Sequence, residues 1–223
     1  MKKSTIVRSI LAWGVYIFYI VFTALAILQA YTHRTYEGHQ LGTEIFRYFT
    51  NDSAIFCALT CIPALFYMLV LRGGHASRMP SWILILRFAG TVSVALTMGT
   101  VAAYLGPLYG YEYMFAGEDL FLHLVGPVLM IFTFIFLESD RPLLRRYTWT
   151  ALIPVQLYAI YYIHNVLVIS KKKGRWPDFY AFNTNNRWYM SLLFMLLITY
   201  LIGLILRVLH NTMYLARHHE NKK

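Results

Sequence analysis

The chain contains 223 residues, of which 58% are hydrophobic and only 13% are charged. Soluble domains carry about 25% charged residues, so this composition excludes an ordinary soluble protein. The formal net charge of +10 does not indicate nucleic acid as a partner, because the Lys and Arg residues lie at the ends of apolar blocks and in the tails, where cations adjoin anionic lipid headgroups.

The apolar residues form six blocks of about 20 residues, the length that spans a bilayer core as a helix. We therefore expect an all-α, polytopic membrane protein: a six-transmembrane-helix bundle that forms a single domain over residues 1–223. The expected helices cover residues 9–31, 48–71, 82–105, 119–137, 149–169 and 188–209.

The first block opens with "MKKSTIVRSILAWGVYIFYIVF", which resembles a signal peptide with an Ala-Leu-Ala cleavage site at residues 24–26. Its apolar stretch continues to Tyr31, which is too long for a signal peptide and favours a retained helix. With six spans, 12 Lys and Arg residues lie on the side of the amino terminus and 7 on the opposite side. This excess favours cytoplasmic termini, although the run "KKKGR" lies on the less basic side.

The second block begins with four polar residues, Thr50, Asn51, Asp52 and Ser53. These residue types are common at helix starts, where their side chains accept hydrogen bonds from free backbone N–H groups, so capping alone explains them. The alternative is that one of the four takes part in chemistry, which requires a partner elsewhere in the chain.

Three further blocks contain polar side chains, which are costly in a bilayer unless they are paired or functional. They are Arg87, His123, and His164 with Asn165. The simplest explanation of Arg87 is snorkelling or an ion pair with a carboxylate, and that of His164 and Asn165 is a hydrogen bond between helices. A single histidine such as His123 is more often a packing or proton-relay residue than a catalytic one.

The polar side chains of the second, fourth and fifth blocks are expected at one depth in the bilayer. In an alternating topology the second and fourth helices start, and the fifth helix ends, on the same face of the membrane. Thr50, His123 and His164 each lie within about one helical turn of that face. The three polar clusters can therefore meet across the bundle.

The surroundings of His123 suit a catalytic imidazole. Asp119 precedes it by four residues on the same helix face, so its carboxylate can hold one ring nitrogen as a donor and leave the other as a base. Pro127 follows by four residues and cannot donate a hydrogen bond to the His123 carbonyl. Together with Gly126 it predicts a kink beside the histidine.

With His123 as the base, Thr50 becomes a candidate nucleophile, because a hydroxyl is a weak nucleophile unless a neighbouring group accepts its proton. The N–H groups at the start of the second helix, and the Asn51 side chain, are the expected oxyanion donors.

The segments "RYFTNDSAIFCAL", "DLFLHLVGPVLMIFTFIFLE" and "GRWPDFYAF" are similar to the androgen-induced-gene/FAR-17a family and to its bacterial relatives, the six-helix Pr6Pr-type membrane proteins. Eukaryotic members are integral-membrane hydrolases that use a Thr and a His to cleave fatty acid esters of hydroxy fatty acids. The resemblance implies that Thr50 is the nucleophile and His123 the base. The chain departs from the family pattern at Asp52, where a neutral residue is common.

The leading hypothesis is an integral-membrane threonine hydrolase that cleaves lipid esters, whose acyl chains enter between helices from the bilayer. Thr50 and His123 would be catalytic, with Asp119, Asn51, Asp52, His164 and Asn165 in supporting positions. The alternatives are a transporter or a small-molecule- or lipid-binding protein, in which His123, His164 and Asp52 line a proton or substrate path, and a structural membrane subunit.

No metal or organic cofactor is expected, because the chain lacks a glycine-rich phosphate loop, a nucleophile elbow and a zinc-ligand pattern. Cys57 and Cys61, one helical turn apart, are expected to be packing residues. The expected partners are membrane lipids and a lipid substrate, and the expected location is a bacterial cell membrane. The sequence leaves the oligomeric state open.

Overall fold

The computed structural model describes residues 3–36, 39–68, 79–170 and 174–220. It contains six helical spans that are long and apolar enough to cross a membrane: Val7–His33, Phe49–Phe66, Ser81–Tyr109, Glu118–Leu137, Arg145–Val168 and Trp188–Arg217. The predicted all-α six-helix fold is confirmed, and the chain is an integral, multi-pass membrane protein.

Each span is one helix or a series of helical segments, where η marks a 3₁₀- or π-helical piece. The α-helices are α1 (Lys3–His33), α2 (Phe49–Phe66), α3 (Ser81–Thr100), α4 (Gly106–Tyr109), α5 (Tyr111–Met114), α6 (Glu118–Leu120), α7 (Gly126–Phe132), α8 (Leu152–Ile163) and α9 (Trp188–Glu220). The 3₁₀-helices are η1 (Gly42–Arg47), η7 (Arg145–Ala151) and η10 (Thr184–Asn186). The π-helical segments are η4 (Val101–Leu105), η5 (Phe121–Val125), η6 (Thr133–Leu137) and η8 (His164–Val168). Two strands of two residues each, β1 (Thr35–Tyr36) and β2 (His39–Gln40), pair in antiparallel orientation.

The observed helix bounds differ from the predicted ones mainly at the carboxyl end. The last helix was expected to end at residue 209 but continues to Glu220. Its polar extension is held by the connection between the fourth and fifth spans: Asn211 bonds both backbone groups of Leu143, at 2.8 and 3.0 Å. His210 lies within 2.9 Å of the Phe134 carbonyl. Residues 69–71 of the predicted second helix lie outside the described residues.

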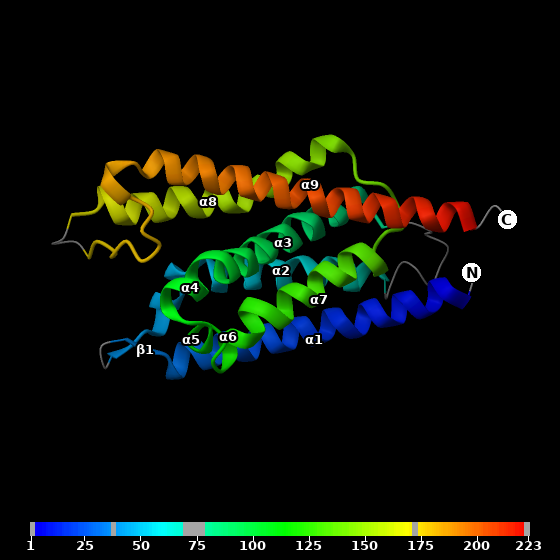
Figure 1. Cartoon of the computed structure of the whole chain (residues 1–223). Coiled ribbons are helices and arrows are strands. Elements are labelled where there is room, and N and C mark those ends of the chain that lie inside the picture. The colour runs from blue at the N-terminus through cyan, green and yellow to red at the C-terminus, as the bar shows by residue number, and fades with distance from the viewer. Residues whose placement is uncertain (1–2, 37–38, 69–78, 171–173, 221–223) are drawn as a thin grey trace.

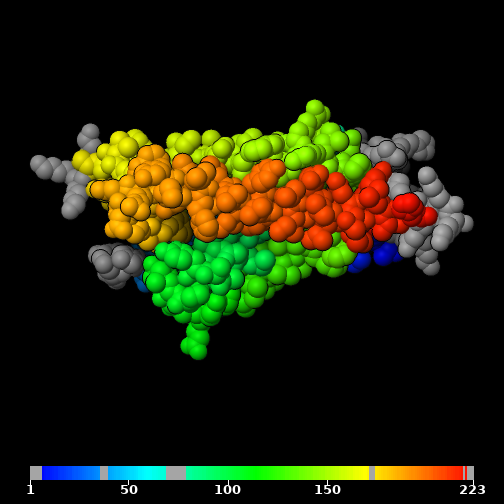
Figure 2. All heavy atoms as spheres, turned by 45° about the horizontal axis from the view of Figure 1, so that its top comes forward, coloured from blue at the N-terminus to red at the C-terminus, as the bar shows by residue number. Residues whose placement is uncertain are grey.

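The six spans run roughly parallel, and α1 begins at the same end of the bundle where α9 ends (Figure 1). The α3 span is the central one, since more of it is buried than of any other span. It contacts α2, α7, α8 and α9. The α9 span, shown from orange to red, covers one face of the bundle along its length, and its apolar side chains are largely exposed, as expected for a surface in contact with lipid (Figure 2).

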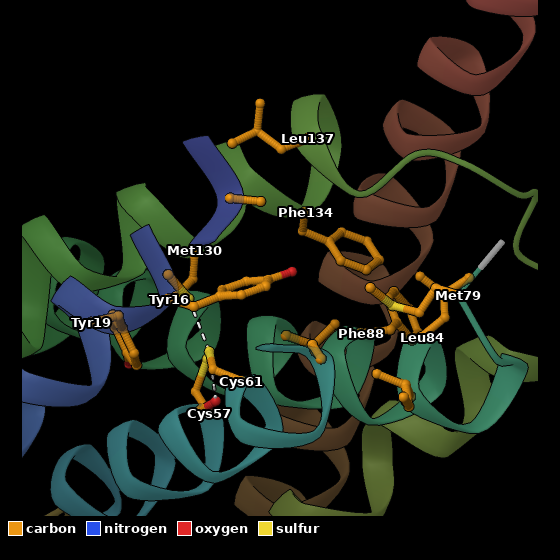
Figure 3. Packing of buried hydrophobic residues seen from close by; sticks show 14 of the residues in the cluster. Tyr16, Tyr19, Cys57, Cys61, Met79, Leu84, Phe88, Met130, Phe134 and Leu137 are labelled. Atoms are coloured by element: carbon orange, nitrogen blue, oxygen red, sulfur yellow. Dashed lines mark hydrogen bonds between the residues drawn. The ribbon is translucent and has the colours of Figure 1, made fainter. Parts of the chain in front are cut away.

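Aromatic and sulfur-containing side chains from four spans fill the interior (Figure 3). Phe88 of α3 packs against Phe134 of η6, with 5.6 Å between the ring centroids. The α2 and α3 backbones approach so closely that a Cβ at Gly90 would lie 2.8 Å from the Thr60 hydroxyl oxygen. Small residues allow such contacts, which hold helices together where lipid offers no hydrophobic contrast.

Arg87 is fully buried in α3 and pairs with Glu138, at the end of the fourth span. Glu138 Oε1 accepts hydrogen bonds from Arg87 Nη2 at 2.9 Å and Nε at 3.2 Å. Arg87 Nη1 donates to the Thr60 hydroxyl at 3.1 Å and to Cys61 Sγ at 3.0 Å. The guanidinium also lies 4.9 Å from the centre of the Tyr16 ring. The expectation of a carboxylate partner is confirmed, and the pair joins α3 to the fourth span.

Replacement of Glu138 by Gln should destabilise the protein by about 3–5 kcal/mol, because it leaves the Arg87 charge buried without its counter-ion. Thermal unfolding of the purified protein in one detergent measures this loss. Glu44→Gln is the matched control, since it removes a carboxylate that is 45% exposed and paired with Arg47, and such pairs contribute about 0–1 kcal/mol. Equal stability of the two variants would contradict the structural role of the buried pair.

Candidate active site

The four polar residues at the start of α2 do not cap the helix. In the described part of the chain, none of the side chains of residues 50–53 accepts a hydrogen bond from a helix-start N–H group. The Phe49 N–H instead donates to the Tyr180 hydroxyl at 3.1 Å. Two of the following N–H groups donate to the Tyr48 carbonyl, at 3.1 and 3.4 Å. The expectation that Asn51, Asp52 or Ser53 satisfies these donors is wrong.

Thr50 and His123 meet in the interior of the bundle. The distance between Thr50 Oγ1 and His123 Nε2 is 3.4 Å, although the two residues are 73 positions apart in the sequence. Both are buried, with exposed fractions of 9% and 6%. Hydrogen bonds between catalytic groups are often long without substrate and shorten in the reacting complex. The expectation from depth is confirmed for this pair.

The second ring nitrogen of His123 is held by a backbone group. His123 Nδ1 lies 2.6 Å from the carbonyl oxygen of Met114 at the end of α5. A carbonyl can only accept a hydrogen bond, so we assign the proton of the neutral ring to Nδ1. The lone pair of Nε2 then faces the Thr50 hydroxyl. This tautomer makes the imidazole a base toward Thr50.

A π-helical turn carries His123. The Gly126 N–H donates to the Phe121 carbonyl, five residues earlier, and Pro127 cannot donate to the carbonyl of His123. A Cβ at Gly126 would lie 3.0 Å from the Tyr19 ring, so the glycine also permits close contact with α1. The residues before Pro127 form a π-turn, a feature common at functional sites, and the predicted kink stays a prediction.

Asp119 does not take the orienting role expected for it. Its carboxylate pairs with Arg34 at 2.5 Å, and the same Arg34 nitrogen lies 2.9 Å from Glu118. The Met114 carbonyl, and not Asp119, accepts the hydrogen bond from the His123 nitrogen that faces away from Thr50. A cation at the end of α1 is a stronger partner for a carboxylate than a neutral ring, which explains the difference.

His164 and Asn165 do not join the pair. The His164 side chain is exposed, and Asn165 Nδ2 donates to the Tyr161 carbonyl of its own helix at 2.8 Å. The expected hydrogen bond between helices is therefore not formed by these side chains. The backbone carbonyl of Asn165 instead accepts a hydrogen bond from the backbone N–H of Trp176 at 3.2 Å. This bond connects the fifth span to the segment before α9.

Asn51 and Ser53 fix the position of the first turn of α2. Asn51 Nδ2 donates to the Ile45 carbonyl of η1 at 2.7 Å, and the Ser53 hydroxyl lies 2.9 Å from that of Thr97 on α3. The bond from Asn51 makes this residue a brace for the corner between η1 and α2. Asp52 lies on another side of the helix from the pair and lines a separate groove.

A cavity of about 580 Å³ reaches Thr50. It lies between α2, α3, η4, α8 and α9, and its wall is mostly apolar, with Leu96, Val101 and Phe194 among its lining residues. Thr50 is part of this wall, whereas His123 is not. The Thr50 hydroxyl can therefore contact a molecule in the cavity, whereas the His123 imidazole is separated from the cavity.

The segment "GRWPDFYAF" closes one side of this cavity, with Tyr180 and Phe182 among the lining residues. Asp178 holds the segment in shape: its carboxylate accepts the N–H groups of Phe182 and Asn183 at 2.8 and 2.7 Å, and the Tyr162 hydroxyl at 2.8 Å. Burial raises the pKa of the Tyr180 hydroxyl, so it stays protonated where it accepts the N–H of the α2 start. This contribution of Tyr180 was not predicted from the sequence.

No family model matches the chain, and no similar protein was found among curated proteins or solved structures. Among the described residues, no group of three or more His, Cys, Asp and Glu side chains could hold a metal ion.

The tautomer of His123 gives a direct test of this geometry. Asp119→Asn should leave the proton of the His123 ring on Nδ1, because the Met114 carbonyl holds it and the carboxylate does not. Nitrogen NMR of the ¹⁵N-histidine-labelled protein, with His123→Gln to assign the signal, distinguishes the two tautomers. A change of tautomer in Asp119→Asn would show that the carboxylate controls the ring after all.

Proposed function

We propose that the protein is a membrane-embedded hydrolase of lipid esters, in which Thr50 is the nucleophile and His123 the base. The observation that carries the proposal is the buried contact of 3.4 Å between Thr50 Oγ1 and His123 Nε2, with the other ring nitrogen held by a backbone carbonyl. The Thr50 hydroxyl, the His123 ring and the Met114 carbonyl thus form a chain of nucleophile, base and orienting acceptor. This arrangement activates a hydroxyl.

In the proposed reaction Thr50 Oγ1 attacks the ester carbonyl carbon while His123 Nε2 takes the hydroxyl proton. The C–O bond of the leaving alcohol then breaks, and the protonated imidazole gives its proton to the departing oxygen. Water hydrolyses the acyl-threonine by the same steps in reverse, with His123 again as the base. The Met114 carbonyl favours the imidazolium at both stages, because it accepts the Nδ1 proton throughout.

The backbone N–H of Thr50 is the candidate oxyanion donor. The neighbouring N–H groups at the start of α2 donate to Tyr180 and Tyr48. The Thr50 N–H itself donates to no described residue. A donor in the first turn of a helix also carries the positive end of the helix dipole. This N–H takes the role that the sequence suggested for the Asn51 side chain.

The cavity beside Thr50 supports a substrate with a long apolar chain, since its lining is mostly apolar and its position within the spans gives access from the bilayer. We further propose cytoplasmic termini in a bacterial cell membrane, on the excess of Lys and Arg on the side of the termini. The site lies at the end of the bundle opposite the termini, near α4 to α6 (Figure 1), so the proposed substrate comes from the outer leaflet.

Thr50→Ala and His123→Gln should each reduce the hydrolysis of a long-chain fluorogenic ester by about 10²–10⁴-fold in nanodiscs, because each removes one half of the nucleophile–base pair. Thr50→Ser should retain part of the activity, since it keeps the hydroxyl. Thr212→Ala is the control, because it removes an α9 hydroxyl that bonds only to its own helix. Wild-type turnover by folded Thr50→Ala would exclude the proposed nucleophile.

Gly99→Phe should shorten the acyl chain that the enzyme accepts. Gly99 lines the cavity, and a Cβ at this position meets no atom within 4 Å, so a larger side chain can enter the open space. We expect KM to rise about tenfold for a long-chain ester and to change little for a short one. Gly14→Phe is the matched control, since Gly14 on α1 is equally open but does not line the cavity. An unchanged chain-length profile would show that the substrate does not occupy this cavity.

A further inference from the structure

A second cavity, of about 560 Å³, lies between α2, α3 and α8. We call it the α2–α8 groove. Phe49 and Tyr158 line both cavities, and their rings, 5.0 Å apart, form a shared wall. Asp52, Phe56, Leu157 and Tyr161 are among the other residues that line the groove. Thr50 and His123 are not part of its lining.

Asp52 is the one charged residue among the described residues that line the groove. It is half-buried, and its carboxylate forms no hydrogen bond or ion pair with a described residue. Four hydroxyls of the groove lining donate to backbone carbonyls instead of to Asp52. These donors are Ser53 to Thr50, Ser93 to Ala89, Thr150 to Tyr147 and Tyr158 to Arg47.

A carboxylate in such surroundings is costly without a counter-charge, and the lining of the groove contains no Lys, Arg or His to supply one. Four aromatic residues line the same groove, namely Phe49, Phe56, Tyr158 and Tyr161. Aromatic faces attract ammonium groups, and quaternary ammonium ligands are commonly bound by several rings together. A carboxylate among aromatic rings therefore fits an organic cation.

We propose that the α2–α8 groove binds a single-chain amphipathic organic cation, with its ammonium group at Asp52 and its alkyl chain along α3 and α8. A metal ion does not fit, because hard cations need about six or more oxygen ligands and Asp52 is the one carboxylate in the described lining. A phospholipid with an ammonium headgroup fits poorly, since its phosphate would stand beside Asp52 with no lining cation to neutralise it. The inference does not depend on the hydrolase proposal.

Photolabelling of the full-length protein in phosphatidylcholine nanodiscs tests the site. The probe is a dodecyltrimethylammonium that carries a diazirine in its chain, and the comparator is the alcohol with the same chain. Mass spectrometry should locate the cation on α2, α3 and α8, at a yield at least about tenfold above that of the alcohol. Equal labelling of the groove by the alcohol would overturn the proposal, because the site would then recognise only the chain.

Variants separate charge recognition from partition into lipid. Asp52→Asn should lower groove labelling by the cation about tenfold or more, and Asp52→Glu should restore part of it. Glu112→Gln, which removes an exposed carboxylate outside the groove, should label as the wild type does. Unchanged labelling of Asp52→Asn would refute the role of the carboxylate.

Two further variants cover other outcomes. Leu157→Trp should block the groove while it keeps Asp52, and Leu157 is 64% exposed, so the larger side chain can be accommodated. If Asp52→Asn does not fold, persistent labelling of Leu157→Trp at the same peptides contradicts the proposal. Thr50→Ala should label normally, so loss of esterase activity and loss of cation binding can be told apart.

Discussion

In a bundle surrounded by lipid, a buried donor or acceptor that has no partner inside the protein is costly, because the hydrocarbon offers none. This constraint explains the polar interior of the protein. Arg87 is tolerated because Glu138 and the groups around it take up its donors. The same requirement holds His123 in place: its Nδ1 proton has the Met114 carbonyl, and its Nε2 lone pair has the Thr50 hydroxyl. A histidine satisfied in this way is also a histidine prepared to act as a base.

The backbone obeys the same constraint at its two Gly-Pro steps. At Gly106-Pro107 and Gly126-Pro127 the glycine N–H donates to the carbonyl five residues earlier, which makes a π-turn of the residues before the proline. Because proline has no N–H, the carbonyl four residues before it loses its usual donor. In the fourth span that carbonyl belongs to His123. The π-turn carries His123, whose ring contacts α2. The backbone disturbance that the proline causes is therefore located at the candidate active site.

The sequence was sufficient to predict the six-span fold and the pairing of Thr50 with His123. The length of the spans and their alternating direction determine the depth of each residue in the membrane. Depth brought Thr50 and His123 to one level, but it does not determine the direction in which a side chain points around its helix. His164 has the expected depth and is exposed on another side of its span. The partner of His123 could not be predicted for a different reason, since the Met114 carbonyl is a backbone group that any residue supplies. Asp119 was misassigned because its competitor, Arg34, lies in the loop after a different span. The resemblance to the androgen-induced-gene/FAR-17a family remains a hypothesis.

The first turn of α2 shows how four consecutive polar residues can serve four purposes. Successive side chains on a helix point about 100° apart, so residues 50–53 face different neighbours. Thr50 faces His123, Asn51 braces the corner through Ile45, Ser53 contacts Thr97, and Asp52 faces the α2–α8 groove. Capping would require these side chains to fold back toward the helix-start N–H groups, three of which donate to Tyr48 and Tyr180 instead. Because other groups take up most of the helix-start donors, each of the four side chains is available for a contact of its own, and Thr50 adjoins one cavity while Asp52 and Ser53 adjoin the other. One turn of α2 therefore contributes a polar side chain to each of the two cavities.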